Sequence, residues 1–530
     1  MHRRIGHALV AVTAGVISAV APAVPAPAGD GTVVATDHGL VRGVAADGVR
    51  MFQGIPFAAP PVGDLRWKAP RPAPPWHGVR DASRPGSACP QGPNAEVPDG
   101  SVNEDCLYLN VTTPATNTRE RLPVVVWIHG GGFSTGTGTS YDAERLVTKG
   151  HIVVVTVNYR LGVFGGLAYP GLPDAGTFGL LDQLAALRWV RANAVAFGAD
   201  PRNVTAAGES AGAMSICALL TSPKARGAFD KAVMESGSCL LHWTKNTWYV
   251  GLDGFTPYIS TQDANDFATE TATQLGCADP AAVMTCLRGK SVGELRSSPF
   301  PFNPTYGNAL LPTHPADAVR AGRVHRLPLL SGGNRDEGNG SAAALESTGH
   351  LTEPAYRALL ADSFGADAAK VAARYPAAMY QSPAAAWGAV ASDRAWACPT
   401  LRGNELLAER TRTYAFEFAD RTAPPLFPAP PGFPLGAAHA HELAYLFDLA
   451  GYHQLQTPAQ ERLADHMIGY WSNFARSGDP NGRALPHWRP VRAGDHRPYV
   501  QSLETTAGFP GPIDLSARHH CGLWRTIAPS

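Results

Sequence analysis

Short, strongly apolar runs rich in β-branched residues alternate along this chain with longer segments of helical periodicity. Residues 122–129 (LPVVVWIH) and 151–159 (HIVVVTVNY) are predicted to be buried strands, and residues 180–196 repeat apolar side chains at helical spacing. Further short strands are expected at residues 203–207, 231–234, 326–330 and 413–418. Strands that alternate with helices need crossover connections. We therefore predict an α/β fold with a mostly parallel central sheet covered by helices on both faces.

The net charge of the chain and its lack of repeats or linkers limit the number of domains and the kinds of partner to expect. Among 530 residues, 44 Lys and Arg balance 44 Asp and Glu, so no basic surplus exists to neutralise phosphates. No internal repeat or low-complexity linker interrupts residues 30–525, and the Pro-rich run 423–434 lies too close to further structured sequence to mark a boundary. We expect one large domain with long inserted loops and no nucleic-acid partner.

The first 28 residues have the features of a signal peptide. Arg3 and Arg4 precede an apolar stretch over residues 8–20, and cleavage is expected after Ala28 or, as an alternative, after Ala23. The apolar stretch is short for a membrane span, and no later segment reaches about 20 uninterrupted apolar residues. We therefore expect a secreted protein without stable membrane insertion, whose mature domain covers residues 29–530.

Eight cysteines fit an oxidising compartment, where disulfides are the preferred interpretation. Cys89 and Cys106 enclose one short loop, and Cys277 and Cys286 enclose another. Spacing alone does not decide how eight cysteines pair. No CxxC pair and no Cys/His cluster has zinc-ligand spacing, so we expect no metal site.

The chemistry of the chain begins at residues 208–212 (GESAG). A predicted strand leads into this motif and a helix-like segment leaves it, which is typical of a nucleophile elbow that holds Ser210 above the edge of a sheet. The two flanking glycines suit a turn too tight for a side chain. The five-residue pattern is weak by itself, and the strand before it and the helix after it give it weight.

A second, independent feature is the run His129 to Phe133 (HGGGF), which follows the predicted strand 122–129. Consecutive glycines allow backbone N–H groups to point into a cavity without a side chain in the way. Such a turn supplies oxyanion donors in lipases and esterases, where each donor is worth about 3–4 kcal/mol. Because it precedes the serine motif in the order that this fold requires, we prefer this interpretation to a plain flexible loop.

These motifs, with several others in one order, resemble the type-B carboxylesterase family of α/β-hydrolases, which includes cholinesterases and secreted bacterial esterases. The resemblance covers nearly the whole mature chain. Its motifs are residues 39–43 (GLVRG), 52–61 (FQGIPFAAPP), 104–110 (EDCLYLN), 127–133 (WIHGGGF), 158–162 (NYRLG), 208–212 (GESAG) and 471–481 (WSNFARSGDPN). The resemblance implies an α/β-hydrolase fold with large loop insertions.

The resemblance also implies a set of site residues. Ser210 matches the nucleophile, Glu337 in residues 334–338 (NRDEG) matches the acid, and His439 in residues 438–442 (AHAHE) matches the base. The order Ser, acid, His is that of α/β-hydrolases. The remaining matches are the oxyanion N–H groups of Gly131, Gly132 and Ala211, and two residues that steady the histidine and the acid loop, Glu209 and Ser236.

Neighbouring residues compete for two of these roles. Asp336 is adjacent to Glu337, but consecutive loop side chains point apart, so only one reaches the histidine, and the resemblance favours Glu337. His441 lies two residues from His439 and is expected to line the pocket or to be hydrogen-bonded. Ala440 departs from the family pattern, which has glycine there, so the local backbone is expected to be less free. We expect His129 to be structural.

Three disulfides follow from the resemblance: Cys89–Cys106, Cys277–Cys286 and Cys398–Cys521. Cys217 and Cys239 are then left over as buried free thiols, with a bond between them as the alternative.

The resemblance gives fewer indications of the substrate. The loop between Cys89 and Cys106 has no aromatic residue to hold a quaternary ammonium group, so a choline ester is not expected. Phe300 and Phe302 fall near the family's acyl-pocket segment, with core packing as the alternative role. Trp243 and Trp248 are candidates to line the gorge.

The leading hypothesis is a secreted, monomeric serine carboxylesterase that acts on small-molecule esters without cofactor or metal. His439, oriented by Glu337, would take the proton of Ser210 during attack, and an acyl-enzyme would follow. Since the base must be neutral, activity should rise through about pH 6–8. The alternatives are amide or lactone hydrolysis on the same triad, and a catalytically silent adhesion or binding member of the family, which typically lacks the nucleophile.

Overall fold

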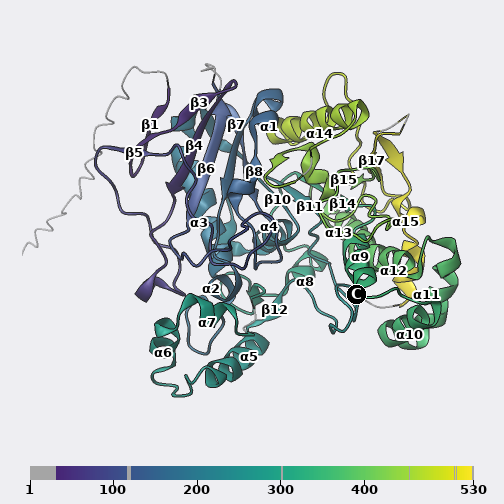
Figure 1. Cartoon of the computed structure of the whole chain (residues 1–530). Helices are drawn as coiled ribbons and strands as arrows, with labels where there is room; N and C mark the ends of the chain where they lie inside the picture. Colours follow the sequence, from purple (N-terminus) through teal and green to yellow (C-terminus); the bar gives the residue numbers. More distant parts are fainter. Residues whose placement is uncertain are drawn as a thin grey trace, which may run out of the picture.

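The computed structural model describes residues 31–115, 121–299, 302–452, 454–506, 508 and 510–527. The proposed signal peptide and Phe300 lie outside these residues. Within them the structure confirms the α/β class: a large sheet has helices on both sides (Figure 1).

The central sheet has eleven strands among the described residues, and its middle is parallel. From β9 through β7, β10, β11, β14 and β15 to β17 all neighbours run parallel, whereas β18 and the β6–β4–β3 edge are antiparallel. In spatial order the strands are β18 (Gly511–Ile513), β17 (Val500–Leu503), β15 (Thr413–Phe418), β14 (Leu329–Asn334), β11 (Lys231–Glu235), β10 (Ala199–Glu209), β7 (Leu122–Ile128), β9 (Val153–Val157), β6 (Tyr108–Pro114), β4 (Val49–Pro56) and β3 (Val44–Ala46).

Strand β7 shows why the centre of the sheet needs cover on both faces, because all of its residues are buried. Successive side chains of a strand point to opposite faces. Val124 and Val126 pack in the core formed with α3 (Phe178–Asn193) and α4 (Ala211–Thr221). Val125 and Trp127 pack in the opposite core, with α1 (Glu144–Gly150) and α14 (Pro458–Ser477). A continuous apolar run therefore marks a doubly covered strand.

The predicted strands all occur, and two of them have clearly shifted boundaries. The strand expected at residues 203–207 is β10, which runs from Ala199 to Glu209. The strand expected at residues 326–330 is β14, which begins at Leu329 and continues to Asn334. Gly332 and Gly333 resemble a turn in the sequence, yet both pair with β15. A Cβ atom at Gly332 would collide with the Phe416 carbonyl of that strand. Glycine is therefore required here by the close approach of a neighbouring backbone, not by a turn.

The remaining elements form smaller sheets and further helices. In the small sheets, β2 (Gly39–Arg42) pairs with both β1 (Val33–Thr36) and β5 (Val79–Asp81), β12 (Ile259–Ser260) pairs with β13 (Thr305–Tyr306), and β8 (Tyr141–Asp142) pairs with β16 (Asp448–Leu449). The other α-helices are α2 (Gly162–Gly166), α5 (Thr261–Gln274), α6 (Val283–Gly289), α7 (Val292–Arg296), α8 (Pro315–Arg320), α9 (Asn339–Ser347), α10 (Glu353–Phe364), α11 (Ala368–Arg374), α12 (Pro383–Ala391), α13 (Cys398–Ala408), α15 (Leu515–Arg518) and α16 (Cys521–Ile527). A π-helical turn, Ser392–Ala397, joins α12 to α13. No helix in the described part of the chain is long and apolar enough to cross a membrane.

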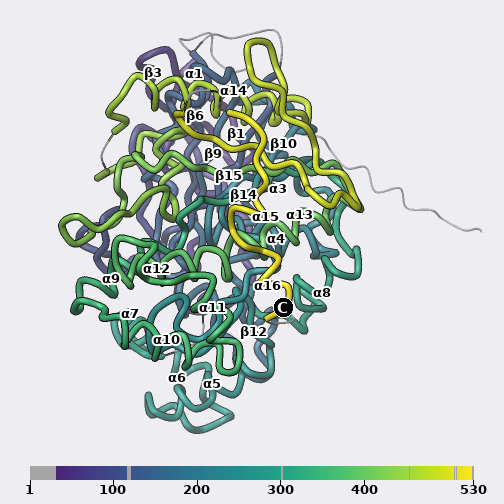
Figure 2. The backbone as a smooth tube through the Cα atoms, turned by 90° about the vertical axis from the view of Figure 1, so that its right-hand side faces the viewer, coloured from purple at the N-terminus to yellow at the C-terminus, as the bar shows by residue number. Residues whose placement is uncertain are grey.

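Disulfides join all eight cysteines. The structure pairs Cys89 with Cys106, Cys277 with Cys286 and Cys398 with Cys521, and the last bond fastens the C-terminal segment, yellow in Figure 2, to the start of α13. Cys217 and Cys239 form a fourth bond, with Cα atoms 5.5 Å apart. The expectation of free thiols there was wrong. In the sequence the two cysteines look like isolated apolar residues, and only the packing of α4 beside β11 brings them together.

Candidate active site

Ser210 occupies a sharp turn between β10 and α4. Its φ of 52° lies in a region that side chains other than glycine rarely adopt, and its N–H donates to the Glu235 carbonyl at 2.9 Å. A Cβ atom at Gly208 or at Gly212 would collide with the Ile128 carbonyl on β7. The turn is therefore possible only with glycine on both sides of the serine, and the serine stands at the carboxyl end of a parallel strand.

A chain of hydrogen bonds runs from Ser210 to a buried carboxylate. His439 Nε2 lies 3.0 Å from Ser210 Oγ, and His439 Nδ1 lies 2.6 Å from Glu337 Oε2. The other oxygen of Glu337 accepts hydrogen bonds from Ser236 Oγ at 2.6 Å and from the Asn334 N–H at 2.7 Å. The structure thus brings the three predicted triad residues together and places Ser236 against the acid. Each candidate group follows its own strand: β10, β14 and β15.

The glycine-rich turn after β7 lies beside the serine. A Cβ atom at Gly130 would stand 3.1 Å from Ser210 Cβ. Gly131 and Gly132 have φ values of 94° and 59°, and within the described residues neither their N–H groups nor that of Ala211 donates a hydrogen bond. These three N–H groups are therefore available to a substrate oxygen, as an oxyanion site requires.

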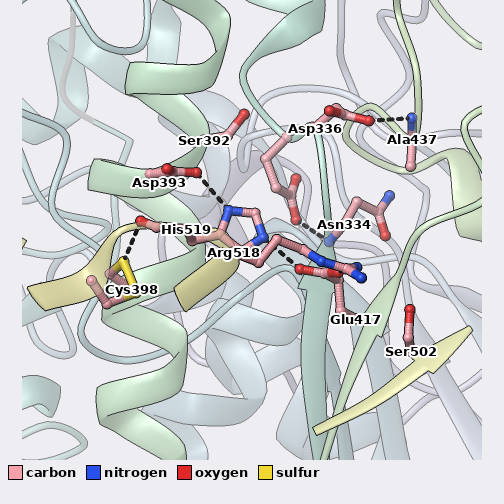
Figure 3. Close-up of polar contacts among 12 residues, drawn as sticks. Asn334, Asp336, Ser392, Asp393, Cys398, Glu417, Ala437, Ser502, Arg518 and His519 are labelled. Atoms are coloured by element: carbon pink, nitrogen blue, oxygen red, sulfur yellow. Dashed lines mark hydrogen bonds and ion pairs between the residues drawn. A yellow bond between two sulfur atoms is a disulfide. The ribbon is translucent and has the colours of Figure 1, made fainter. Parts of the chain in front are cut away.

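The two rival residues point elsewhere. Asp336 accepts hydrogen bonds from the Ala437 N–H at 3.0 Å (Figure 3) and from Arg421 Nε at 2.9 Å. His441 is buried, where its Nδ1 donates to the Gly436 carbonyl, and burial lowers its pKa to about 4. Ala440 adopts φ of 67°, so a residue with a side chain stands in a left-handed conformation next to the candidate base.

His439 is surrounded by carboxylates. Burial by itself lowers the pKa of His439, but the negative charges of Glu209 and Glu337 outweigh burial and raise the pKa to about 9. Glu209 Oε1 lies 3.2 Å from His439 Nε2. Burial and repulsion by Glu337 raise the pKa of Glu442 to about 7. Activity should therefore rise at higher pH than the range of about 6–8 expected from an ordinary imidazole.

Tryptophans pack around the candidate base. The Trp396 ring centroid lies 4.6 Å from that of His439, and the Trp248 ring meets the imidazole edge-on at 6.4 Å. Trp243 is buried behind them and stacks on Phe255. Trp248 was a candidate from sequence, whereas Trp396 was missed. It lies in the π-helical turn, for which the sequence carries no signal beyond the bulky residue itself.

An apolar cavity of about 600 Å³ lies next to the glycine-rich turn. Ser134 and Thr135, which directly follow that turn, form one wall, and Phe302 is part of the lining. The rest of the lining includes Gly92, Leu161, Val163, Phe164, Ile259, Phe267, Leu295 and Arg296. The volume suits a small organic ligand.

A second buried ionic cluster lies beside the acid loop (Figure 3). The His519 ring bridges two carboxylates, with Nδ1 2.5 Å from Asp393 Oδ1 and Nε2 2.5 Å from Glu417 Oε1. Burial lowers the pKa of His519, but the two carboxylates outweigh burial and raise the pKa to about 10. Arg518 pairs with the other oxygen of Glu417. No group of three or more His, Cys, Asp or Glu side chains among the described residues is arranged to hold a metal ion.

The large mixed sheet, the serine turn after β10, and the acid and histidine on later loops define the α/β-hydrolase fold. Residues 30–511 match the sequence model of the carboxylesterase family. The chain belongs to that family and is a hydrolase.

Characterised relatives extend over most of the chain. This chain is 33% identical over 488 residues to the cocaine esterase of Homo sapiens, and the alignment spans 84% of this chain and 82% of that protein. It is 35% identical over 492 residues to the fumonisin B1 esterase of Sphingopyxis macrogoltabida, and this alignment spans 86% of this chain and 83% of that protein. It is 42% identical over 316 residues to the para-nitrobenzyl esterase of Bacillus subtilis, and this alignment spans 58% of this chain and 63% of that protein. The named activities are all ester hydrolysis, on chemically different substrates.

Proposed function

We propose that this protein is a secreted serine carboxylesterase that works through Ser210, His439 and Glu337. The observation that carries the proposal is the continuous hydrogen-bonded path from Ser210 Oγ through the imidazole to Glu337. The serine nucleophile needs a base within hydrogen-bond reach, and the base needs a third group to fix its tautomer. Both conditions are met by this arrangement.

The reaction follows from these positions. His439 accepts the proton of Ser210 as Oγ attacks the ester carbonyl, and Glu337 stabilises the imidazolium that forms. The N–H groups of Gly131, Gly132 and Ala211 stabilise the oxyanion. The imidazolium then protonates the departing alcohol, and a water molecule repeats the same steps on the acyl-enzyme, which releases the acid.

We propose that the protein is secreted from the cell. The cationic and apolar start of the chain predicts a signal peptide. Four disulfides among the described residues fit an extracellular or secretory protein.

The cavity beside Ser134 and Thr135 is proposed to hold the larger apolar part of the ester. It adjoins the turn that carries the proposed oxyanion donors, and most of its lining is apolar. A substrate whose reacting carbonyl lies over Ser210 can then extend into it.

The test is hydrolysis of p-nitrophenyl acetate, butyrate, octanoate and palmitate by the purified mature protein. Ser210→Ala should lower the rate by about 10⁴-fold or more, while Ser477→Ala, at the end of α14, should retain it. Activity that survives in a folded Ser210→Ala variant would exclude this nucleophile. No turnover of any ester by folded wild-type protein would refute the esterase proposal, and amide and lactone substrates would then be compared.

A further inference from the structure

The acid loop and the histidine loop are fastened to each other through Asp336 and Ala437. The Asp336 N–H donates to the Ala437 carbonyl at 2.9 Å, and the Asp336 carboxylate accepts from the Ala437 N–H at 3.0 Å. Both polar groups of the Ala437 backbone are thus bound by one residue. Asp336 immediately precedes Glu337, and Ala437 lies two residues before His439.

The Asp336 carboxylate is itself held in place. Arg421 Nε donates to the same oxygen at 2.9 Å, and this carboxylate is only 14% exposed. A Cβ atom at Gly436 would collide with that carboxylate, so the histidine loop passes directly over it. Gly436 has φ of 62°, a conformation that glycine adopts without strain. The histidine loop can therefore approach the Asp336 carboxylate this closely only with glycine at position 436.

Asn334 joins the same two loops from the interior. Its Nδ2 donates to the Ala438 carbonyl at 2.7 Å and to the Glu442 carboxylate, while its N–H donates to Glu337. The histidine loop is thus bound at two consecutive residues: Asp336 binds Ala437, and Asn334 binds Ala438. Neither Asp336 nor Asn334 contacts Ser210 or His439 through a hydrogen bond among the described residues.

We propose that Asp336 is a positioning residue, which sets the distance between His439 and Glu337 by clamping the two loops together. This inference rests on the proposed function of those two residues. The reacting groups depend on hydrogen bonds of 2.6 and 3.0 Å. A displacement of about 1 Å in such a site costs about 100-fold in rate. Asp336 is one residue from Glu337, and Ala437 is two residues from His439. A shift of either loop at the clamp therefore moves the acid or the base.

The experiment compares Asp336→Ala, which removes the acceptor, with Asp336→Asn, which keeps an oxygen for the Ala437 N–H. Asp465→Ala removes an exposed ion-paired carboxylate on α14 and is the matched control. Each variant is titrated with an organophosphate to count active sites, and kcat and KM are measured on p-nitrophenyl butyrate. Asp336→Ala should lower kcat per titrated site by about 10- to 100-fold at nearly constant KM. Asp336→Asn should stay within about 5-fold of wild type, and the control should be unchanged.

Two further readouts separate positioning from stability. In Asp336→Ala the acid limb of the kcat/KM profile should move to lower pH, because a less well placed Glu337 stabilises the imidazolium less. The downfield proton resonance of the His439–Glu337 hydrogen bond should weaken or disappear. A variant with a lower melting temperature but wild-type kcat per site, pH limb and resonance would overturn the proposal.

The resonance is read without any substrate. It therefore tests the clamp even if wild-type protein hydrolyses no ester, in which case the proposed function alone would fail.

Discussion

Single carboxylates decide how the candidate base titrates. Glu209 lies 3.2 Å from the nitrogen of His439 that faces Ser210. Its negative charge is one of the two strongest influences that hold the pKa of His439 at about 9 in spite of burial. The base must be neutral to accept a proton, so this carboxylate delays the onset of activity as pH rises. The same charge stabilises the imidazolium in the transition state.

Glu209→Gln should therefore move the acid limb of the kcat/KM profile to lower pH. Removal of the negative charge lowers the pKa of His439, so the neutral base is present at a lower pH. The maximum rate should fall, by about 10-fold, because less charge stabilises the imidazolium. The profile is measured from pH 5 to 10 on a short-chain ester, with Glu353→Gln on α10 as an exposed control. An acid limb that stays in place or moves upward would contradict this account.

The sequence predicts which side chains lie together only where chemistry requires a motif. Ser210, Glu337 and His439 were assigned by their motifs, and the structure places them within hydrogen-bond distance. Trp396 also packs on His439, with the two ring centroids 4.6 Å apart, yet no local sequence pattern predicts this contact. Its position depends on a π-helical turn, and such turns are set by tertiary packing rather than by local propensity.

Among the elements, the C-terminal segment illustrates what sequence could not predict. The strands β7, β9 and β15 were recognisable because continuous burial requires continuous apolar sequence. No sequence motif marks His519. Only the fold places it between Asp393 of the π-helical turn and Glu417 of β15, which are distant in sequence. Long-range ionic contacts of this kind have no sequence periodicity.

The His519 cluster should make stability depend on alkaline pH. The folded-state pKa of His519 is raised to about 10, above its unfolded value of about 6.5. Its stabilisation is therefore complete below about pH 6.5 and is lost as pH rises through about 10. His519→Gln should lower the free energy of unfolding by about 3 kcal/mol at pH 6, because buried Asp393 loses its cation and Glu417 keeps only Arg518. The loss should shrink towards pH 10.

Urea unfolding of wild type and variant at pH 6, 8 and 10 measures this dependence, with exposed His350→Gln as the control. His439 titrates in the same window, so the difference between the two proteins, rather than the wild-type curve, isolates His519. An equal loss of stability at all three pH values would show that the imidazolium is not the stabilising species.

At the scale of the whole molecule, the apolar cavity should limit the size of the ester. Gly92 lines it, and a Cβ atom there would meet nothing within 4 Å. Gly92→Phe should therefore fill the cavity without backbone strain. We expect kcat/KM to fall by about 10-fold or more for p-nitrophenyl octanoate, and to change by less than about 3-fold for the acetate. Gly522→Phe, where a Cβ atom also meets nothing, is the matched control. Equal effects on both esters would place the substrate elsewhere.

The lining of this cavity and the proposed triad come from different parts of the chain. The cavity wall is built from residues 90–92, 134–135 and 161–164, and from Ile259, Phe267, Leu295, Arg296, Ser298, Pro299 and Phe302. The triad residues follow β10, β14 and β15, which are fixed in the sheet by their neighbours. Heritable change can therefore alter the wall without disturbing the reacting groups. A lineage with this architecture can acquire a new ester substrate by loop replacement while its reaction stays the same.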